Sequence, residues 1–129
     1  MKTRIKNSLA ACVLGTLSLS AHAQVSDDVV KIGVLGDQSG MMADLSGKFG
    51  VEAVKMAVED FGGTVLGKPI EVISADHQNK VDIGVSIARR WYENDKVDLI
   101  LDVPNSAIAL AVQDLTRQMK PVSYTHLRA

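Results

Sequence analysis

The chain has 129 residues, of which 47% are hydrophobic, 22% are charged and 4% are aromatic, and its formal net charge is −1. This length suits one compact domain, and the apolar fraction is too high for a disordered chain. The near-neutral charge argues against a nucleic-acid-binding surface. The single cysteine allows neither an internal disulfide nor a Cys-x-x-Cys metal or redox site.

Residues 1–23 have the three parts of an export signal: a basic start, an apolar stretch over 9–19 and a small-x-small site before cleavage. Cleavage is expected between Ala23 and Gln24, which predicts a periplasmic mature protein. The apolar stretch is shorter than the roughly 20 residues that span a bilayer. A lipoprotein signal centred on Cys12 is the alternative, but the apolar stretch continues past this cysteine, which favours cleavage after Ala23.

The mature sequence begins with alternating strand and helix patterns. Residues 29–35 form a β-rich run that ends in a turn-rich segment, and a helix is predicted over about 47–61. Gly62-Gly63 is typical of a helix end. The apolar face of this helix is predicted to comprise Val51, Val54, Ala57, Val58 and Phe61.

The alternation continues with a strand over 69–74, a helix over about 80–94 and a strand over 97–103. A last helix opens at Pro104-Asn105-Ser106. The predicted inward residues of the 80–94 helix are Val81, Val85, Ala88 and Tyr92, and those of the last helix are Ile108, Ala111, Val112, Leu115 and Met119.

This order predicts an α/β fold with a Rossmann-like open parallel sheet. Sites in such sheets lie at the carboxyl ends of the strands, beside the switch in strand order. The loops in question are 36–46, 75–79 and 103–107.

Several catalytic and cofactor motifs are absent from these loops. The glycines of the first loop lack the spacing of a dinucleotide fingerprint, and Gln38-Ser39-Gly40 is not a nucleophile elbow. Without the end segments His77 is the only histidine, so a histidine metal cluster is excluded, and a histidine in a polar loop is expected to be a solvated surface residue. We therefore expect no enzyme activity and no cofactor or metal.

Three strand-end acids leave a distant alternative open. Asp37, Asp76 and Asp102 follow successive strands, which resembles a phosphoacceptor receiver domain. Such domains work with cytosolic phosphodonors, whereas this chain carries an export signal.

The loop before the last helix favours anion binding. Asn105 or Ser106 can cap this helix, and the free N–H groups of its first turn favour a negatively charged ligand. No nucleophile or general base accompanies them, which indicates recognition and not turnover.

The segments VVKIGVLGDQSG, VEDFGG, LGKPIEVISADHQNK and VDLILDVPNSAIALAV resemble the branched-chain amino acid type of solute-binding protein, the type I periplasmic binding proteins that serve ABC transporters. The resemblance covers about residues 29–121. It implies two lobes that close on a solute, and residues 24–121 would be part of the N-terminal lobe. Residues 122–129, VSYTHLRA, resemble a translated sequencing adapter and are expected to be non-native.

The resemblance also implies a ligand site. Asn105, Ser106 and the Ala107 amide match the positions that hold the ligand carboxylate. Asp37, Gln38 and Ser39 would line the cleft, and Leu45 stands where many members have an aromatic residue.

The implied solute is a branched-chain amino acid or a related amino acid, aromatic acid or amide, and the implied partner is a membrane ABC permease. A periplasmic sensory module of a receptor is the alternative function, and an enzyme is a more remote one.

Overall fold

The structure is a computed structural model that describes residues 27–119. The predicted signal peptide, its cleavage site and residues 122–129 lie outside these residues. The elements in chain order are β1 (Val30–Gly36), α1 (Ala43–Ser46), α2 (Lys48–Asp60), β2 (Thr64–Val65), β3 (Lys68–Asp76), α3 (Val81–Arg90), the π-helical turn η1 (Trp91–Asp95), β4 (Leu99–Leu101) and α4 (Ser106–Met119).

The sheet has four strands in the order β2-β3-β1-β4. β1 is central and pairs in parallel with β3 along its whole length and with β4 over Ile32–Val34. The short β2 pairs with β3 in antiparallel fashion. The predicted open, mainly parallel α/β sheet is therefore confirmed.

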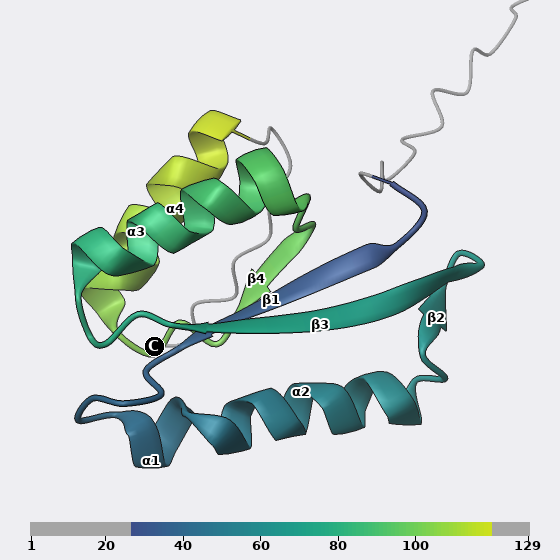
Figure 1. Ribbon diagram of the computed structural model, residues 1–129, viewed down its shortest axis with the longest axis horizontal. Helices are drawn as coiled ribbons and strands as arrows, with labels where there is room; N and C mark the ends of the chain where they lie inside the picture. Colours follow the sequence, from purple (N-terminus) through teal and green to yellow (C-terminus); the bar gives the residue numbers. More distant parts are fainter. Residues whose placement is uncertain (1–26, 120–129) are drawn as a thin grey trace, which may run out of the picture.

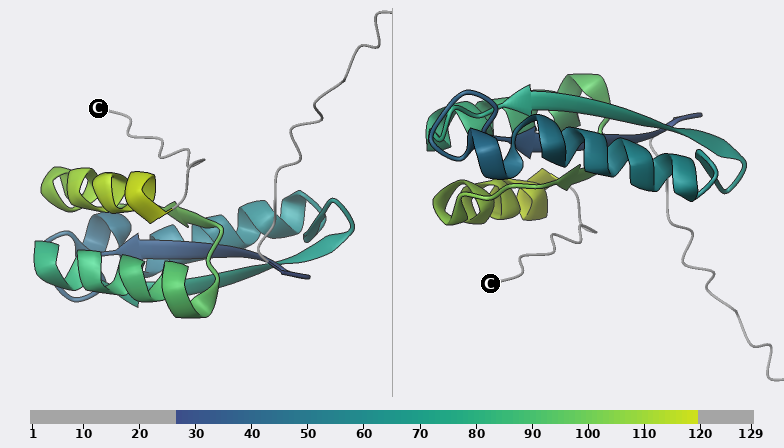
Figure 2. Two further views of the ribbon diagram at one scale, coloured as in Figure 1. Left: turned by 90° about the horizontal axis from the view of Figure 1, so that it is seen from above. Right: turned by 90° about the horizontal axis from the view of Figure 1, so that it is seen from below.

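The helices cover both faces of the sheet. α3 and α4 lie on one face and α1 and α2 on the other, which gives three layers (Figures 1 and 2). The larger core lies between the sheet and α3–α4, where its buried members are Leu35, Ala88, Trp91, Tyr92, Val97, Ile100, Ile108, Val112 and Leu115. Among residues 27–119 no helix combines the length and the apolar character needed to cross a membrane.

The end of α2 follows the sequence prediction. Gly62 and Gly63 both have positive φ, of 99° and 69°. The N–H of Gly62 donates to the carbonyl of Glu59, and that of Gly63 donates to the carbonyl of Val58. This pair of bonds is the Schellman arrangement, which satisfies the last carbonyls of a helix.

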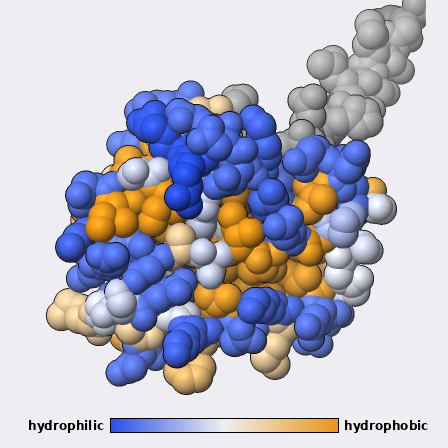
Figure 3. Space-filling model, viewed as in Figure 1, coloured by the Kyte–Doolittle hydropathy of each residue, from blue (hydrophilic) through white to orange (hydrophobic). Residues whose placement is uncertain are grey.

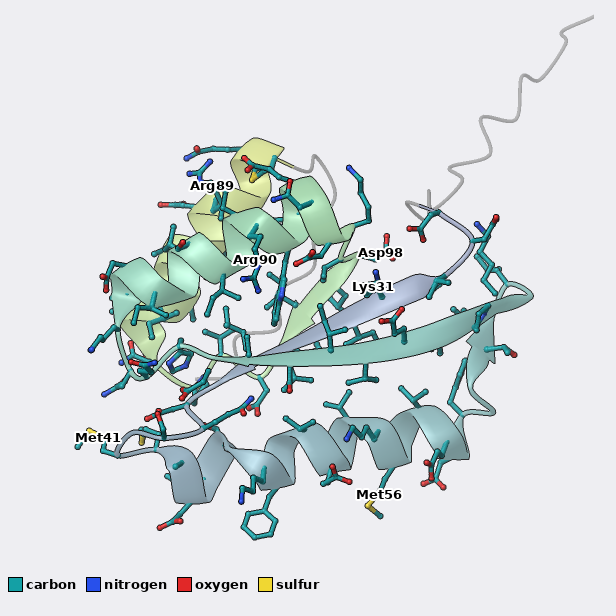
Figure 4. The ribbon with its side chains drawn as sticks, viewed as in Figure 1. Lys31, Met41, Met56, Arg89, Arg90 and Asp98 are labelled. Atoms are coloured by element: carbon teal, nitrogen blue, oxygen red, sulfur yellow. The ribbon has the colours of Figure 1, made fainter. Side chains whose placement is uncertain are left out.

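Two helix faces were predicted incorrectly in part. Ala57 and Phe61 of the expected apolar face of α2 are exposed, Phe61 to 67%, and Val81 of α3 is exposed as well. The outer side of α2 also carries exposed apolar residues such as Phe49 and Met56. Met56 points away from the sheet in Figure 4, and separate light orange patches, divided by blue surface, lie along the lower edge of Figure 3. α2 thus has apolar side chains on its sheet-facing and its outer side.

Other differences arise from backbone geometry. The predicted 80–94 helix is α-helical only to Arg90 and continues as η1, which ends at Lys96 with a φ of 56°. β4 is shorter than predicted because Asp102 adopts a φ of 54°, which no strand accommodates. α1 and the β2–β3 hairpin were not predicted. The two turn residues of the hairpin, Leu66 and Gly67, both have positive φ, which is typical of a type I′ turn.

The close approach of Gly33 to Trp91 gives a test of this packing. A Cβ at Gly33 would lie 2.5 Å from Cζ3 of the buried Trp91 ring. We expect Gly33→Ala to lower the free energy of unfolding by about 1–3 kcal/mol, as overpacked cores do. Urea denaturation measures this change. If the contact is the cause, Gly33→Ala combined with Trp91→Leu will cost less than the sum of the two single changes, and strict additivity would contradict the packing described.

Candidate functional site

The three parallel strands β1, β3 and β4 end at one edge of the sheet. The helices that follow β1 and β3 lie on opposite faces, so the strand order switches between β1 and β4 (Figure 1). Ligands of open α/β sheets bind at such a switch point, outside the carboxyl ends of the strands. The loops after these strands, predicted from the sequence, therefore form the candidate site.

Asp37 organises the loop after β1. Its side chain is wholly buried, and its carboxylate accepts the backbone N–H of Gly40 at 2.7 Å and that of Met42 at 2.9 Å. A Cβ at Gly40 would lie 2.5 Å from both carboxylate oxygens, so a larger residue there would displace the Asp37 carboxylate. Both oxygens of this predicted cleft residue are thus engaged within its own loop.

Gln38 and Ser39 are held by Asp76 at the end of β3. The Asp76 carboxylate accepts the N–H of Gln38 at 2.9 Å and the hydroxyl of Ser39 at 2.5 Å. It also accepts the N–H of Gln78 at 2.8 Å. Burial raises the pKa of Asp76, but these three hydrogen bonds and the nearby His77 outweigh it, so its pKa is lowered. An ionised Asp76 therefore links the loops after β1 and β3.

Asn105 caps α4 and is also bonded to the loop after β3. Its Oδ1 accepts the N–H groups of Ala107 and Ile108 at 2.9 and 3.1 Å. Its Nδ2 donates to Oδ1 of Asn79 at 2.6 Å. The expected capping role is confirmed for Asn105. The Ala107 amide, expected to face a ligand, is already bonded to the cap.

Ser106 is the first residue of α4 and is exposed. Neither its N–H nor its hydroxyl has a hydrogen-bond partner within residues 27–119. Of the three residues predicted to hold a ligand carboxylate, Ser106 is thus the one whose side-chain hydroxyl stays available to a ligand.

Leu45 lies in α1 and is 77% exposed. Its neighbour Ser46 is buried, donates to the carbonyl of Met42 and accepts the N–H of Asp37. Nothing in the sequence pattern around Ser46 predicted this role. A contact between Leu45 and a ligand stays a prediction.

Asp102 begins the loop after β4. Its Oδ2 is buried and has no hydrogen-bond partner among the described residues. Burial raises the pKa of Asp102, and the nearby His77 opposes this shift in part. A Cβ at Gly50 would lie 2.2 Å from this oxygen, so α2 approaches the loop closely here. Among residues 27–119 no group of three His, Cys, Asp or Glu side chains could jointly hold a metal ion.

The prediction for His77 was wrong. The side chain is wholly buried, not solvated, because the chain turns under α3 and α4 directly after β3. Its backbone N–H donates to the carbonyl of Gly36 at 3.0 Å, and its Nδ1 accepts the N–H of Asn79 at 3.0 Å. Burial lowers the pKa of His77, and the carboxylates of Asp37, Asp76 and Asp102 oppose this in part.

Comparison with known proteins places this geometry in a family. The sequence profile described as periplasmic binding protein matches residues 29–127 and so runs into the 122–129 segment predicted to be non-native. No curated protein matches the chain.

Solved structures give closer detail. A periplasmic binding protein from Burkholderia mallei is 52% identical over 74% of this chain and 26% of that one, with a TM-score of 0.71. A branched-chain amino acid ABC transporter periplasmic ligand-binding protein from Burkholderia xenovorans is 48% identical over 73% and 25%, with a TM-score of 0.69. An ABC transporter solute-binding protein from Rhodopseudomonas palustris, solved with 3,4-dihydroxybenzoic acid, is 30% identical over 71% and 25%, with a TM-score of 0.61.

The matched part of this chain thus spans about a quarter of these relatives. The relatives are described as periplasmic, ligand-binding and solute-binding proteins, and the expectation of a binding protein without enzyme activity agrees with this family. The type I resemblance seen in the sequence is confirmed as well. The chain belongs to the periplasmic binding protein family.

Proposed function

We propose that this chain is part of a solute-binding protein that captures a small carboxylate-bearing solute for import by an ABC transporter. The observation that carries the proposal is the start of α4, which opens at the switch-point edge of the sheet with the free donors of Ser106. A helix start attracts a carboxylate because its N–H groups and dipole favour negative charge.

The sequence resemblance allows branched-chain amino acids, related amino acids, aromatic acids and amides, and the carboxylate-bearing classes among them are the proposed solutes. Two relatives support this range: one is described as a branched-chain amino acid ABC transporter periplasmic ligand-binding protein, and another was solved with 3,4-dihydroxybenzoic acid. Both solute types share a carboxylate, which is the group that Ser106 would bind.

The remaining parts of the proposal concern the protein as a whole. Residues 24–121 would form part of the N-terminal lobe, and the solute would be held between this lobe and a second one. Residues 1–23 would direct export to the periplasm, where a membrane permease would receive the loaded protein. Residues 122–129 would be a non-native segment.

A thermal-shift screen of the full-length protein identifies the solute. A ligand that binds the native state raises the melting temperature. The panel contains L-leucine, L-isoleucine, benzoate, 3,4-dihydroxybenzoate, acetamide and urea. We expect stabilisation by a carboxylate-bearing member, and stabilisation by urea or acetamide alone would contradict the carboxylate assignment.

Ser106→Ala tests the site. We expect it to weaken binding of the solute found in the screen about tenfold, equivalent to about 1.4 kcal/mol, because a hydroxyl donor to the carboxylate is lost. Isothermal titration calorimetry measures the affinity. Ser86→Ala is the matched control, since Ser86 is an exposed serine on α3 outside the three loops. Equal affinities of the two variants would remove Ser106 from the site.

The two-lobe arrangement makes a separate prediction. A purified fragment of residues 24–121 should bind the same solute at least about a hundredfold more weakly than the full-length protein, because contacts from the second lobe are missing. Calorimetry on both proteins gives the comparison, with circular dichroism to establish that the fragment is folded. Tight binding by the folded fragment would overturn this arrangement.

A further inference from the structure

We propose that His77 is a positioning residue for the solute site, holding the first turn of α4 in place through Asn79 and Asn105. The role in solute binding rests on the proposed function above. His77 itself lies beneath the loops and would not touch the solute.

A continuous chain of hydrogen bonds connects His77 to α4. Nδ1 of His77 accepts the N–H of Asn79 at 3.0 Å, and Oδ1 of Asn79 accepts Nδ2 of Asn105 at 2.6 Å. Oδ1 of Asn105 then accepts two N–H groups of the first turn of α4. The position of Ser106 therefore depends on a ring that lies at the end of another strand.

The backbone shows why Asn79 needs this support. Gln78 and Asn79 have φ of 51° and 56°, in the left-handed region that residues other than glycine adopt at a cost. The bond to Nδ1 of His77 stabilises the backbone there, and this backbone directs the Asn79 side chain toward Asn105.

The bond also fixes the protonation state of the ring. Because Nδ1 accepts a hydrogen bond, the neutral ring carries its proton on Nε2, which has no partner within residues 27–119. A second proton on Nδ1 would face the N–H of Asn79 and break the bond. Protonation of His77 should therefore release Asn79.

The groups around the His77 ring determine the pH at which it is protonated. Asp37, Asp76 and Asp102 face it from the loops after the three strands and favour protonation, but burial outweighs them. The uncharged Gly84 of α3 lies beside the Cβ of His77, and Ile108 of α4 packs against the same glycine. Lys80 and Asp82, beside the start of α3, are exposed.

The direction of the pH effect follows from this balance. The pKa of His77 is lower in the folded state than its ordinary value of 6.5, so the unfolded state binds more protons in this range. The relay, by which we mean the hydrogen bonds that run from His77 through Asn79 to Asn105, is intact above pH 6.5. It is lost as the pH falls through the folded pKa of His77.

Amide hydrogen exchange of the solute-free, full-length protein tests the relay without any solute. The readout is the protection factor of Ala107 and Ile108, corrected for the intrinsic effect of pH on exchange. In the wild type we expect protection to fall roughly fivefold or more as the pH is lowered from 7.5 through the folded pKa of His77, as loss of one hydrogen bond implies.

Three variants separate positioning from simple packing. His77→Asn keeps an acceptor near the position of Nδ1 but does not titrate, so its protection should match the wild type at pH 7.5 and stay flat with pH. In His77→Ala the amides of Ala107 and Ile108 should be weakly protected over the whole pH range. Asn79→Gly tolerates the positive φ and removes the side-chain link, so protection should be low and independent of pH. A pH-independent wild type, or His77→Asn as weakly protected as His77→Ala, would overturn the proposal.

The affinity for L-isoleucine and for 3,4-dihydroxybenzoate, measured over the same pH range, separates this proposal from the proposed function. If either compound binds, its affinity for the wild type should decrease as the pH is lowered. Its affinity for His77→Asn should stay constant over the same range. A pH-independent affinity together with pH-dependent protection would overturn the role of His77 in solute binding. If neither compound binds at any pH, the proposed solute range is wrong, and the exchange result alone decides whether His77 positions α4.

Discussion

The last residue of β3 and the three residues that follow it form the connection on which the rest of the candidate site depends. Asp76 bonds to Gln38 and Ser39 of the loop after β1, and Asn79 bonds to Asn105 at the start of α4. The sheet brings the ends of β1, β3 and β4 to one edge but does not by itself fix how the loops sit there. The residues 76–79 do so, because they are hydrogen-bonded to both neighbouring loops.

This connection divides the polar residues of the edge into two groups. Asp37, Asp76 and Asn105 have their side-chain oxygens bonded to backbone N–H groups or to neighbouring side chains, so they build the loops. Ser106 keeps both of its donors available at the surface. A binding protein benefits from this division, since loops already held in place lose less conformational freedom when a ligand binds.

Much of the fold could be predicted from the sequence. The alternation of β-rich runs with amphipathic helices identifies three parallel strands and the helices between them, and the glycines at 62–63 mark a helix end. The helix cap at Asn105 was among the expected possibilities. These features are local, so the pattern of neighbouring residues is enough to find them.

The rest depends on contacts between distant residues. His77 lies in a polar segment that reads as a surface loop, and only the packing of α3 and α4 over the end of β3 buries it. The role of Asn79 likewise arises from its side chain meeting that of Asn105, a residue 26 positions away. Asp102 shortens β4 through a left-handed backbone conformation that its residue type permits but does not require.

The most direct test of this account is amide hydrogen exchange after Asp76→Ala, with Ser39→Ala as the control. Asp76→Ala removes the acceptor of the Gln38 and Gln78 amides, whereas Ser39→Ala removes only the hydroxyl that bonds to the same carboxylate. We expect exchange of both amides to rise roughly tenfold in Asp76→Ala and to change little in Ser39→Ala. The amides that pair β1 with β3, such as that of Val34, should keep their wild-type exchange in both variants. If the Gln38 amide stays as protected in Asp76→Ala as in the wild type, the loop after β3 does not hold the site together.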